Sequence, residues 1–301
     1  DSYEVGSQNW TDGFDKTFAG RIGYDPIPML PVLTGRVVES AKDSDGFLSD
    51  LRRTVSELVM ENYVGGLREV AAEHGLRLWC ENYGHWGFPS EFLSYGGYAD
   101  QIGGEFWSGG LNLGSIESRA ASSAAHIYGK QTVFAEAFTS FNDFSKHPYV
   151  IKRRGEELFC EGINQMVFHT MTCQKPSEGK PGLEYGAGTH FNPNVTWWNQ
   201  TAGPWVSYIN RCQALLQSGL FAADVLYYNG DWAPNLVGPK HDPAGLGKGY
   251  DYDVCNEEVL LTRISVQDGK IVLPDGMSYR VLVLPDTTKM PAPVAKKLRE
   301  L

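Results

Sequence analysis

Hydrophobic residues recur along the chain in a unit made of an amphipathic helix, a glycine, a short apolar strand and a loop. In the first copy, Leu51, Val55, Leu58 and Val59 have the spacing i, i+4, i+7 and i+8, which places them on one face of a helix. Gly75 follows this helical stretch, as glycine commonly does at a helix C-terminus. The pattern therefore predicts a helix that ends near this glycine and a strand directly after it.

Three more copies of the unit follow. The predicted helices occupy residues 115–129, 148–162 and 205–219, and the predicted strands occupy residues 130–138, 163–171 and 220–230. The strands are apolar without alternation, which is typical of a parallel sheet that is covered on both faces. An open doubly wound sheet and a (β/α)8 barrel both fit this pattern.

Polar residues near the strand ends favour the barrel. Glu81, Glu136 and His169 stand at or near the ends of three predicted strands, and Glu105 stands in a further short strand. Active sites of barrels are assembled from the C-terminal ends of several strands. We therefore expect residues 1–220 to be the C-terminal part of a catalytic (β/α)8 barrel of the TIM type, with about five of its strands present.

The pattern changes after residue 220. Residues 221–301 contain apolar strands, a stretch rich in glycine and proline, turns built on Asp-Gly pairs and a closing helix. An Asp-Gly pair between two apolar runs is typical of a β-hairpin. We expect this region to be the start of a second, truncated α/β domain.

The stretch TVFAEAF, residues 132–138, is unusual because it places the charged residue Glu136 inside an apolar strand. Burying an unpaired carboxylate costs several kcal/mol. Glu136 is therefore expected either to have a partner in the fold or to stand at a strand end that faces a wet pocket.

The amino-acid composition indicates which kinds of molecule the protein could bind. The net charge of −10 disfavours nucleic acid, whose binding needs a basic surface, and no run approaches the ~18 apolar residues of a membrane helix. Aromatic residues make up 12 % of the chain, which fits either a large core or a sugar site, since sugar faces stack on aromatic rings. The five cysteines form no C-x-x-C pair, so a zinc–thiolate site is not expected.

The acidic residues predicted at strand ends are Glu4, Glu81, Glu105 and Glu136. Each one alone could cap a helix or pair with an arginine. Several of them on a barrel rim, surrounded by aromatic residues, form the apparatus of glycoside hydrolysis. One carboxyl group then donates a proton to the leaving oxygen, and another acts as nucleophile or activates water.

A loop is predicted over residues 186–205, and it carries His190, Trp197 and Trp198. These side chains could contact a sugar, or the two tryptophans could pack the loop onto the barrel. His169 has two similar interpretations, either as a site residue or as a buried core imidazole.

Several longer stretches resemble one family. DSYE, NWT, RIGYD and LPVLTG occur in this order near the start, and FAEAF, GTHFNPNVTWW, QALLQSGLFAADVLYYNGD and LPDGMSYRVLVLP follow. Together they resemble the family 106 glycoside hydrolases, the calcium-dependent α-L-rhamnosidases, nearly from end to end.

The resemblance implies an inverting α-L-rhamnosidase that cleaves terminal rhamnosyl linkages with two glutamates. By motif, Glu4 of DSYE would be the general acid and Glu136 of FAEAF the general base. The resemblance also implies a Ca²⁺ site near the sugar hydroxyls, with Glu105 and Glu81 as the expected ligands, since Ca²⁺ prefers several hard oxygen ligands. The side chains expected to contact the substrate are Glu81, His169, His190, Trp197 and Trp198.

The same likeness implies that residues 221–301 begin a flavodoxin-like, amidotransferase-like domain with a structural role. The substrate would be a carbohydrate, such as a rhamnosyl glycoside or a plant polysaccharide side chain. The chain starts at Asp1 without a methionine and ends inside a predicted helix, so we interpret it as a piece of a longer, secreted or periplasmic enzyme. Two alternatives stay open: a retaining barrel glycosidase of the β-galactosidase kind, and a carbohydrate-binding barrel without catalysis.

Overall fold

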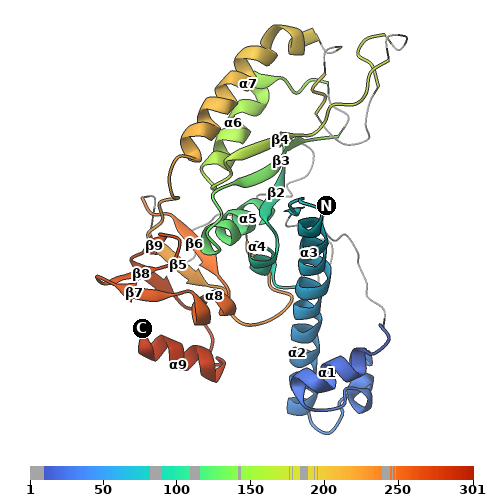
Figure 1. Cartoon of the computed structure of the whole chain (residues 1–301), viewed down its shortest axis with the longest axis vertical. Helices are drawn as coiled ribbons and strands as arrows, with labels where there is room; N and C mark the ends of the chain where they lie inside the picture. Colours follow the sequence, from blue (N-terminus) through green and yellow to red (C-terminus); the bar gives the residue numbers. More distant parts are fainter. Residues whose placement is uncertain are drawn as a thin grey trace.

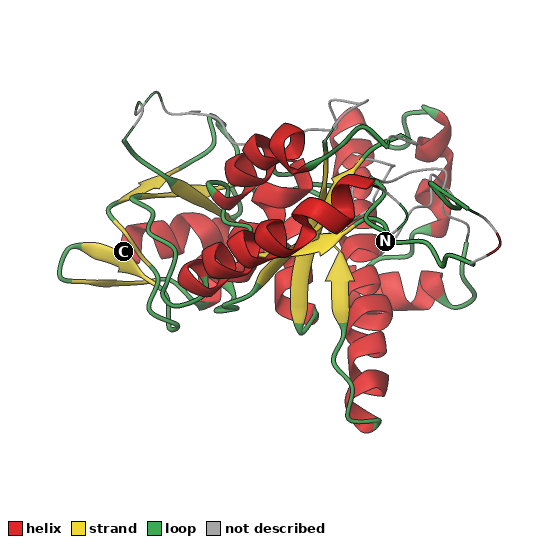
Figure 2. Cartoon of the chain, turned by 90° about the horizontal axis from the view of Figure 1, so that it is seen from above, coloured by secondary structure: helices red, strands yellow, loops and turns green. Residues whose placement is uncertain are grey.

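The computed structural model describes most of the chain. The described residues are 10–81, 90–108, 116–141, 144–175, 177, 179–183, 189–192, 194, 196–238, 245, 247 and 249–301. Within them, helices alternate with the strands of two parallel sheets (Figure 1), and Figure 2 shows the same helices and strands from above.

The N-terminal part of the described chain is helical. Its elements are α1 (Phe14–Ile22), the 3-10 helix η1 (Ile27–Thr34), α2 (Ala41–Leu58), the π-helix η2 (Val59–Gly65) and α3 (Gly66–Glu73). Ser40 caps α2, since its hydroxyl accepts a hydrogen bond from the N–H of Asp43, and Gly75 with a φ of +69° follows the end of α3. α1 and η1 pack on α2 around a small core that contains Phe18 and Phe47. The helix end predicted near residue 75 is therefore confirmed.

Four parallel strands form the first sheet, in the order β1-β2-β3-β4. They are β1 (Trp79–Glu81), β2 (Gln101–Trp107), β3 (Val133–Thr139) and β4 (Gln165–Phe168). Spatial order follows sequence order, and a helical segment connects each strand to the next, as parallel strands require. The predicted short strand that carries Glu105 is confirmed as β2.

The connecting helices cover one face of this sheet. They are η3 (Phe92–Ser94) and α4 (Tyr95–Tyr98) before β2, α5 (Ile116–Ile127), α6 (Pro148–Phe159) and α7 (Thr196–Leu216). Gly104 of β2 lets α5 approach closely, because a Cβ there would lie 2.8 Å from Glu117. Gly155 of α6 acts in the same way toward β3, since its Cβ would lie 2.9 Å from the ring of Phe138. The helices on this face therefore pack directly against the strands.

The loop predicted over residues 186–205 is partly wrong, because Thr196–Leu216 is helix α7. The Gly-Pro pair and the polar residues of this stretch favour a loop locally. The ring of Trp205 is nevertheless buried 5.9 Å from that of Phe138, centre to centre. Burial of an aromatic side chain stabilises by ~2–3 kcal/mol, which is similar to the cost of Pro204 inside the helix.

Helix α5 also packs on the second sheet, so it lies between the two sheets (Figure 1). Arg119 is fully buried there; its guanidinium donates to the backbone oxygen of Tyr252 at 2.8 Å and lies 4.8 Å from the centre of that ring. Nδ1 of His126 lies 2.8 Å from Oδ1 of buried Asp253, whose Oδ2 accepts from the hydroxyl of Tyr279 at 2.9 Å. These polar contacts connect α5, which packs on the first sheet, to residues of the second and third sheets.

The second sheet is parallel and has the order β10-β5-β6, and a small antiparallel sheet has the order β7-β8-β9. The elements are β5 (Val225–Tyr228), β6 (Tyr252–Cys255), α8 (Glu257–Thr262), β7 (Ser265–Gln267), β8 (Lys270–Val272), β9 (Ser278–Tyr279), β10 (Val281–Val283) and α9 (Ala292–Glu300). Asp268 and Gly269 both have positive φ and connect β7 to β8. The hairpin predicted from an Asp-Gly pair is therefore confirmed.

These elements confirm an α/β fold with parallel strands. Closure of the first sheet into a barrel, the flavodoxin-like identity of residues 221–301 and a domain boundary at residue 220 stay predictions. Among the helices that the structure describes, none has the length and apolar character needed to span a membrane.

Candidate functional site

Three glutamates project from one face of the first sheet. Glu105 of β2 is the register partner of Glu136 of β3, and Glu81 of β1 is the partner of Gly103, two residues before Glu105. Side chains of register partners point to the same face of a sheet, and so do side chains two residues apart. Glu81, Glu105 and Glu136 therefore share one face, opposite the face where Gly104 meets α5.

Glu136 has two polar neighbours on this face. The hydroxyl of Thr139 donates to Oε1 of Glu136 at 3.0 Å, and Nδ1 of His169 lies 3.6 Å from the same oxygen. The side chain of Glu136 is 30 % exposed, so the carboxylate is partly open to solvent. The expectation that Glu136 has a partner in the fold is therefore confirmed, and the glutamate also faces a cavity, although from inside β3 and not from its end.

The strands end only partly as predicted. Glu81 is the last residue of β1 and His169 directly follows β4, whereas Glu136 lies inside β3, which continues to Thr139. β3 is longer because Thr139 still pairs with Trp107 of β2. The prediction that a strand ends on Glu136 is therefore wrong.

A cavity of about 200 Å³ opens beside Glu81 and Glu136. The apolar or aromatic side chains that line it are Tyr63, Val64, Leu67, Leu78, Trp79, Cys80, Phe134 and Val167. The rings of Trp79 and Phe134 have centres 4.2 Å apart, and a Cβ on Gly103 would lie 2.3 Å from Phe134. A glycine at this position therefore lets the two rings meet across β2. Carboxylates beside an aromatic surface are a combination that suits a sugar.

The acidity of Glu81 is altered by its surroundings on this face. Burial raises the pKa of Glu81 to about 7, and the nearby charges of Glu136 and Glu105 act in the same direction. A carboxyl group with this pKa is partly protonated near neutral pH. Glu81 can therefore donate a proton or exchange it for a cation.

The expected Ca²⁺ ligands Glu81 and Glu105 are both buried on this face. Within the part of the chain that the structure describes, no group of three or more His, Cys, Asp and Glu residues could hold a metal ion. Carboxylate oxygens are the ligand type that Ca²⁺ prefers, but it takes six to eight of them. These two residues fit as part of a coordination shell, and the other ligands would have to be water, substrate or residues outside the described ranges.

Three other predicted substrate contacts are packed into the protein. His190 is buried and stacks on Phe144, with ring centres 4.1 Å apart. Trp197 and Trp198 are half-buried near the start of α7, with ring centres 6.1 and 5.8 Å from that of Phe191. None of the three is among the described residues that line the cavity beside Glu81 and Glu136, so a contact with substrate stays a prediction for each.

The predicted general acid, Glu4, lies outside the described residues. Two contributors to the site were missed by the sequence-based predictions: Thr139, which binds Glu136, and the paired rings of Trp79 and Phe134. The hydroxyl of Thr139 had a weak signal, as a polar residue closing an apolar strand. The ring pair had none, because it depends on Gly103 of an intervening strand.

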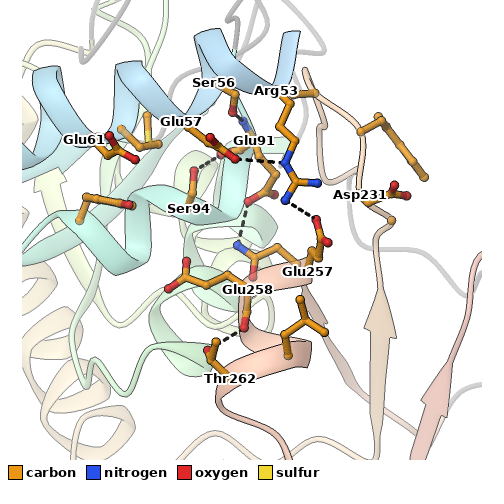
Figure 3. A pocket seen from close by; sticks show the side chains of 17 residues that line it. Arg53, Ser56, Glu57, Glu61, Glu91, Ser94, Asp231, Glu257, Glu258 and Thr262 are labelled. Carbon is orange, nitrogen blue, oxygen red and sulfur yellow. Dashed lines mark hydrogen bonds and ion pairs between the residues drawn. The ribbon is translucent and has the colours of Figure 1, made fainter. Parts of the chain in front are cut away.

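A second cavity, of about 380 Å³, lies between α2, η2 and α8 (Figure 3). Arg53 pairs there with Glu57 at 3.1 Å and with Glu257 at 3.2 Å. Burial raises the pKa of Glu91 to about 7, although the side-chain amide of Asn256 donates to it at 2.8 Å. The five glutamates of this cavity take part in internal ion pairs and hydrogen bonds, so we do not assign it to the catalytic site. They are Glu57, Glu61, Glu91, Glu257 and Glu258.

A comparison with protein families gives a match over the whole chain. The model of the family Glyco_hydro_106, described as alpha-L-rhamnosidase, matches residues 1–301. The chain therefore belongs to this family of glycoside hydrolases.

Two known proteins resemble the chain in particular. The structure of a rhamnosidase from Novosphingobium sp. PP1Y has a TM-score of 0.88 and 31 % identity, over 100 % of this chain and 29 % of that chain. A protein from Formosa agariphila named "Putative beta-glucuronidase" is 38 % identical over 302 residues, which cover 100 % of this chain and 25 % of the relative. The chain thus spans 25 % and 29 % of the length of these two proteins.

Proposed function

We propose that the whole protein is an inverting α-L-rhamnosidase that hydrolyses terminal rhamnosyl linkages. The observation that carries the proposal is the register of β1, β2 and β3, which brings Glu81, Glu105 and Glu136 to one face beside an aromatic cavity. Family membership and the similarity to a rhamnosidase structure support the same class of reaction.

The first sheet is proposed to be part of a (β/α)8 barrel, and residues 221–301 to begin a flavodoxin-like domain. Within the described residues, β1 and β4 are the edge strands of the first sheet. Exposed edges of parallel strands are normally paired or covered. Trp79 of β1 is 50 % exposed, and in a closed barrel this ring would face the interior. Its exposure supports closure by further strands of the whole protein.

In the proposed reaction, Glu136 acts as the general base. Its carboxylate takes a proton from a water molecule while that water attacks the anomeric carbon, and Glu4 protonates the leaving oxygen. The water enters from the side opposite the leaving group, so the anomeric configuration inverts. A separation of roughly 6.5–9.5 Å between the two carboxyl groups would leave room for this water.

We also propose that Glu105 and Glu81 bind a Ca²⁺ ion. When bound, the ion would hold two hydroxyl groups of the sugar in fixed positions. The raised pKa of Glu81 supports a cation here, because burial and two neighbouring carboxylates disfavour its ionised form when no counter-charge is present.

The charge of the site favours a neutral sugar over a glucuronide. Among the described residues that line the cavity there is no lysine or arginine, while Glu81 and Glu136 both line it. A glucuronide would bring a further carboxylate to this face, and the like charges would repel. Rhamnose is neutral, and its methyl group suits apolar walls such as those made by Phe134 and Val167. We propose a rhamnosyl glycoside or a plant polysaccharide side chain as substrate, and a secreted or periplasmic location for the protein.

A panel of nitrophenyl glycosides tests this function on the full-length protein, with and without a strong chelator. The panel contains the α-L-rhamnoside, the β-D-galactoside and the β-D-glucuronide. We expect turnover of the rhamnoside, with the inverted anomer as the first product in the NMR spectrum. Turnover of the glucuronide alone would contradict the assigned sugar, and a retained anomer would favour the retaining alternative.

A further inference from the structure

The strand that carries Glu136 contains one extra residue. The pairs between β2 and β3 run regularly from Ile102 with Val133 to Phe106 with Ala137, and the next pair is Trp107 with Thr139. Phe138 therefore has no partner on β2, which is the arrangement of a β-bulge. Phe138 also has a φ of +67°, a conformation that a bulky residue rarely adopts.

This bulge changes which face Thr139 occupies. In a regular strand, residues three apart point to opposite faces, so Thr139 would point away from Glu136. The extra residue shifts the alternation by one position and returns Thr139 to the face of Glu136. Thr139 is 2 % exposed, and its hydroxyl donates to Oε1 of Glu136 at 3.0 Å.

Packing on the opposite face holds the bulge in place. The ring of Phe138 is fully buried, with its centre 4.9 Å from that of Phe106 and 5.9 Å from that of Trp205. The backbone oxygen of Phe138 accepts hydrogen bonds from the hydroxyls of Ser108, at 3.0 Å, and Thr189. The unusual backbone conformation is thus fixed by contacts on both its side chain and its carbonyl group.

The contacts of Glu136 lie on one oxygen. Thr139 donates to Oε1, and His169 lies 3.6 Å from the same atom, whereas Oε2 accepts no hydrogen bond from a described residue. A carboxylate fixed through one oxygen presents the other oxygen in a defined direction. This is what a general base needs in order to take a proton from a water molecule.

We propose that Thr139 is a positioning residue for Glu136, and that the bulge at Phe138 serves to bring the hydroxyl of Thr139 to the carboxylate of Glu136. The inference rests on the proposed role of Glu136 as general base. Thr139 acts through the orientation of that carboxylate and does not itself contact the substrate. Its contribution is therefore expected in the rate of the chemical step rather than in binding of the sugar.

The test compares Thr139→Val, Thr139→Ser and Glu136→Gln in the full-length protein, with nitrophenyl α-L-rhamnoside as substrate. Thr139→Val removes the hydroxyl and keeps the shape, so we expect kcat to fall about 10- to 100-fold, with a smaller change in KM. Thr139→Ser keeps the hydroxyl and should restore most of kcat. Thr139→Ala replaces the valine variant if the latter lowers the melting temperature.

Thr54→Val is the matched control. Thr54 is as buried as Thr139, but its hydroxyl donates to the backbone oxygen of Asp50 inside α2. This variant should keep the wild-type kcat. A wild-type kcat in folded Thr139→Val, or equal losses in Thr139→Val and Thr139→Ser, would overturn the inference. If Glu136→Gln itself keeps the wild-type rate, the proposed function fails, which is a different result.

Discussion

Glu105 and Glu136 are direct register partners on neighbouring parallel strands. Partner residues in a sheet lie about 5 Å apart, and like charges at such positions destabilise it. Glu81 adds a third carboxyl group on the same face, two register positions before this pair. A sheet built for stability alone would not keep this arrangement. Groups that violate local rules of stability in this way are typical of functional sites.

Gly103 gives a prediction about the aromatic packing beside these glutamates. A methyl group in Gly103→Ala would lie 2.3 Å from the ring of Phe134 and would push it away from Trp79. Overpacking of this kind costs about 1–3 kcal/mol. We expect a lower melting temperature, measured by scanning calorimetry, together with weaker sugar binding.

Gly46→Ala is the control for this prediction. Gly46 lies in α2 and nothing is within 4 Å of the position of its Cβ. Alanine in a helix interior is more stable than glycine by about 0.5–1 kcal/mol, so the melting temperature should stay the same or rise. A loss of the same size in both variants would show that the ring pair of Trp79 and Phe134 is not what Gly103→Ala disturbs.

The pattern of apolar positions predicted the parallel strands well, because burial on both faces leaves a continuous apolar run that can be read locally. Glu136 could be placed on a strand for this reason, since TVFAEAF is apolar on both sides of it. The bulge at Phe138 could not be predicted, since its positive φ is held by rings from β2 and α7 that are distant in sequence. The start of α7 near Trp197 could not be predicted either. Its local sequence favours a loop, whereas the packing of Trp197 on Phe191 favours the helix.

The acidity of Glu91 predicts a pH-dependent stability. Burial raises its pKa from 4.5 to about 7, so the folded state holds the proton more tightly than the unfolded state does. This stabilisation is fully present below about pH 4.5 and is lost as the pH rises through 7, by up to about 3 kcal/mol. Glu91→Gln cannot ionise, so its melting temperature relative to that of wild type should rise between pH 4.5 and 8. If the difference in melting temperature between Glu91→Gln and wild type stays constant across this pH range, the raised pKa of Glu91 is contradicted.

The proposed Ca²⁺ site predicts binding that can be measured without turnover. Glu105→Gln removes one carboxylate, so Ca²⁺ should bind at least about tenfold more weakly in a calorimetric titration of the full-length protein. Excess Ca²⁺ should partly restore binding of the sugar. Glu69→Gln, which removes an exposed carboxylate from α3, should leave the titration unchanged. Equal Ca²⁺ affinity in wild type and Glu105→Gln would exclude this glutamate as a ligand.

The role of Glu136 as general base is tested most directly by the turnover number of Glu136→Gln in the full-length protein. Nitrophenyl α-L-rhamnoside is the substrate, and the melting temperature is the check of folding. Glutamine keeps the shape of the side chain and its hydrogen bond from Thr139, but it cannot take a proton from water. We expect kcat to fall by about 10²- to 10⁴-fold while the variant stays folded. A folded Glu136→Gln variant with the wild-type kcat would contradict this role, because the glutamate face would then have a structural role and no part in hydrolysis.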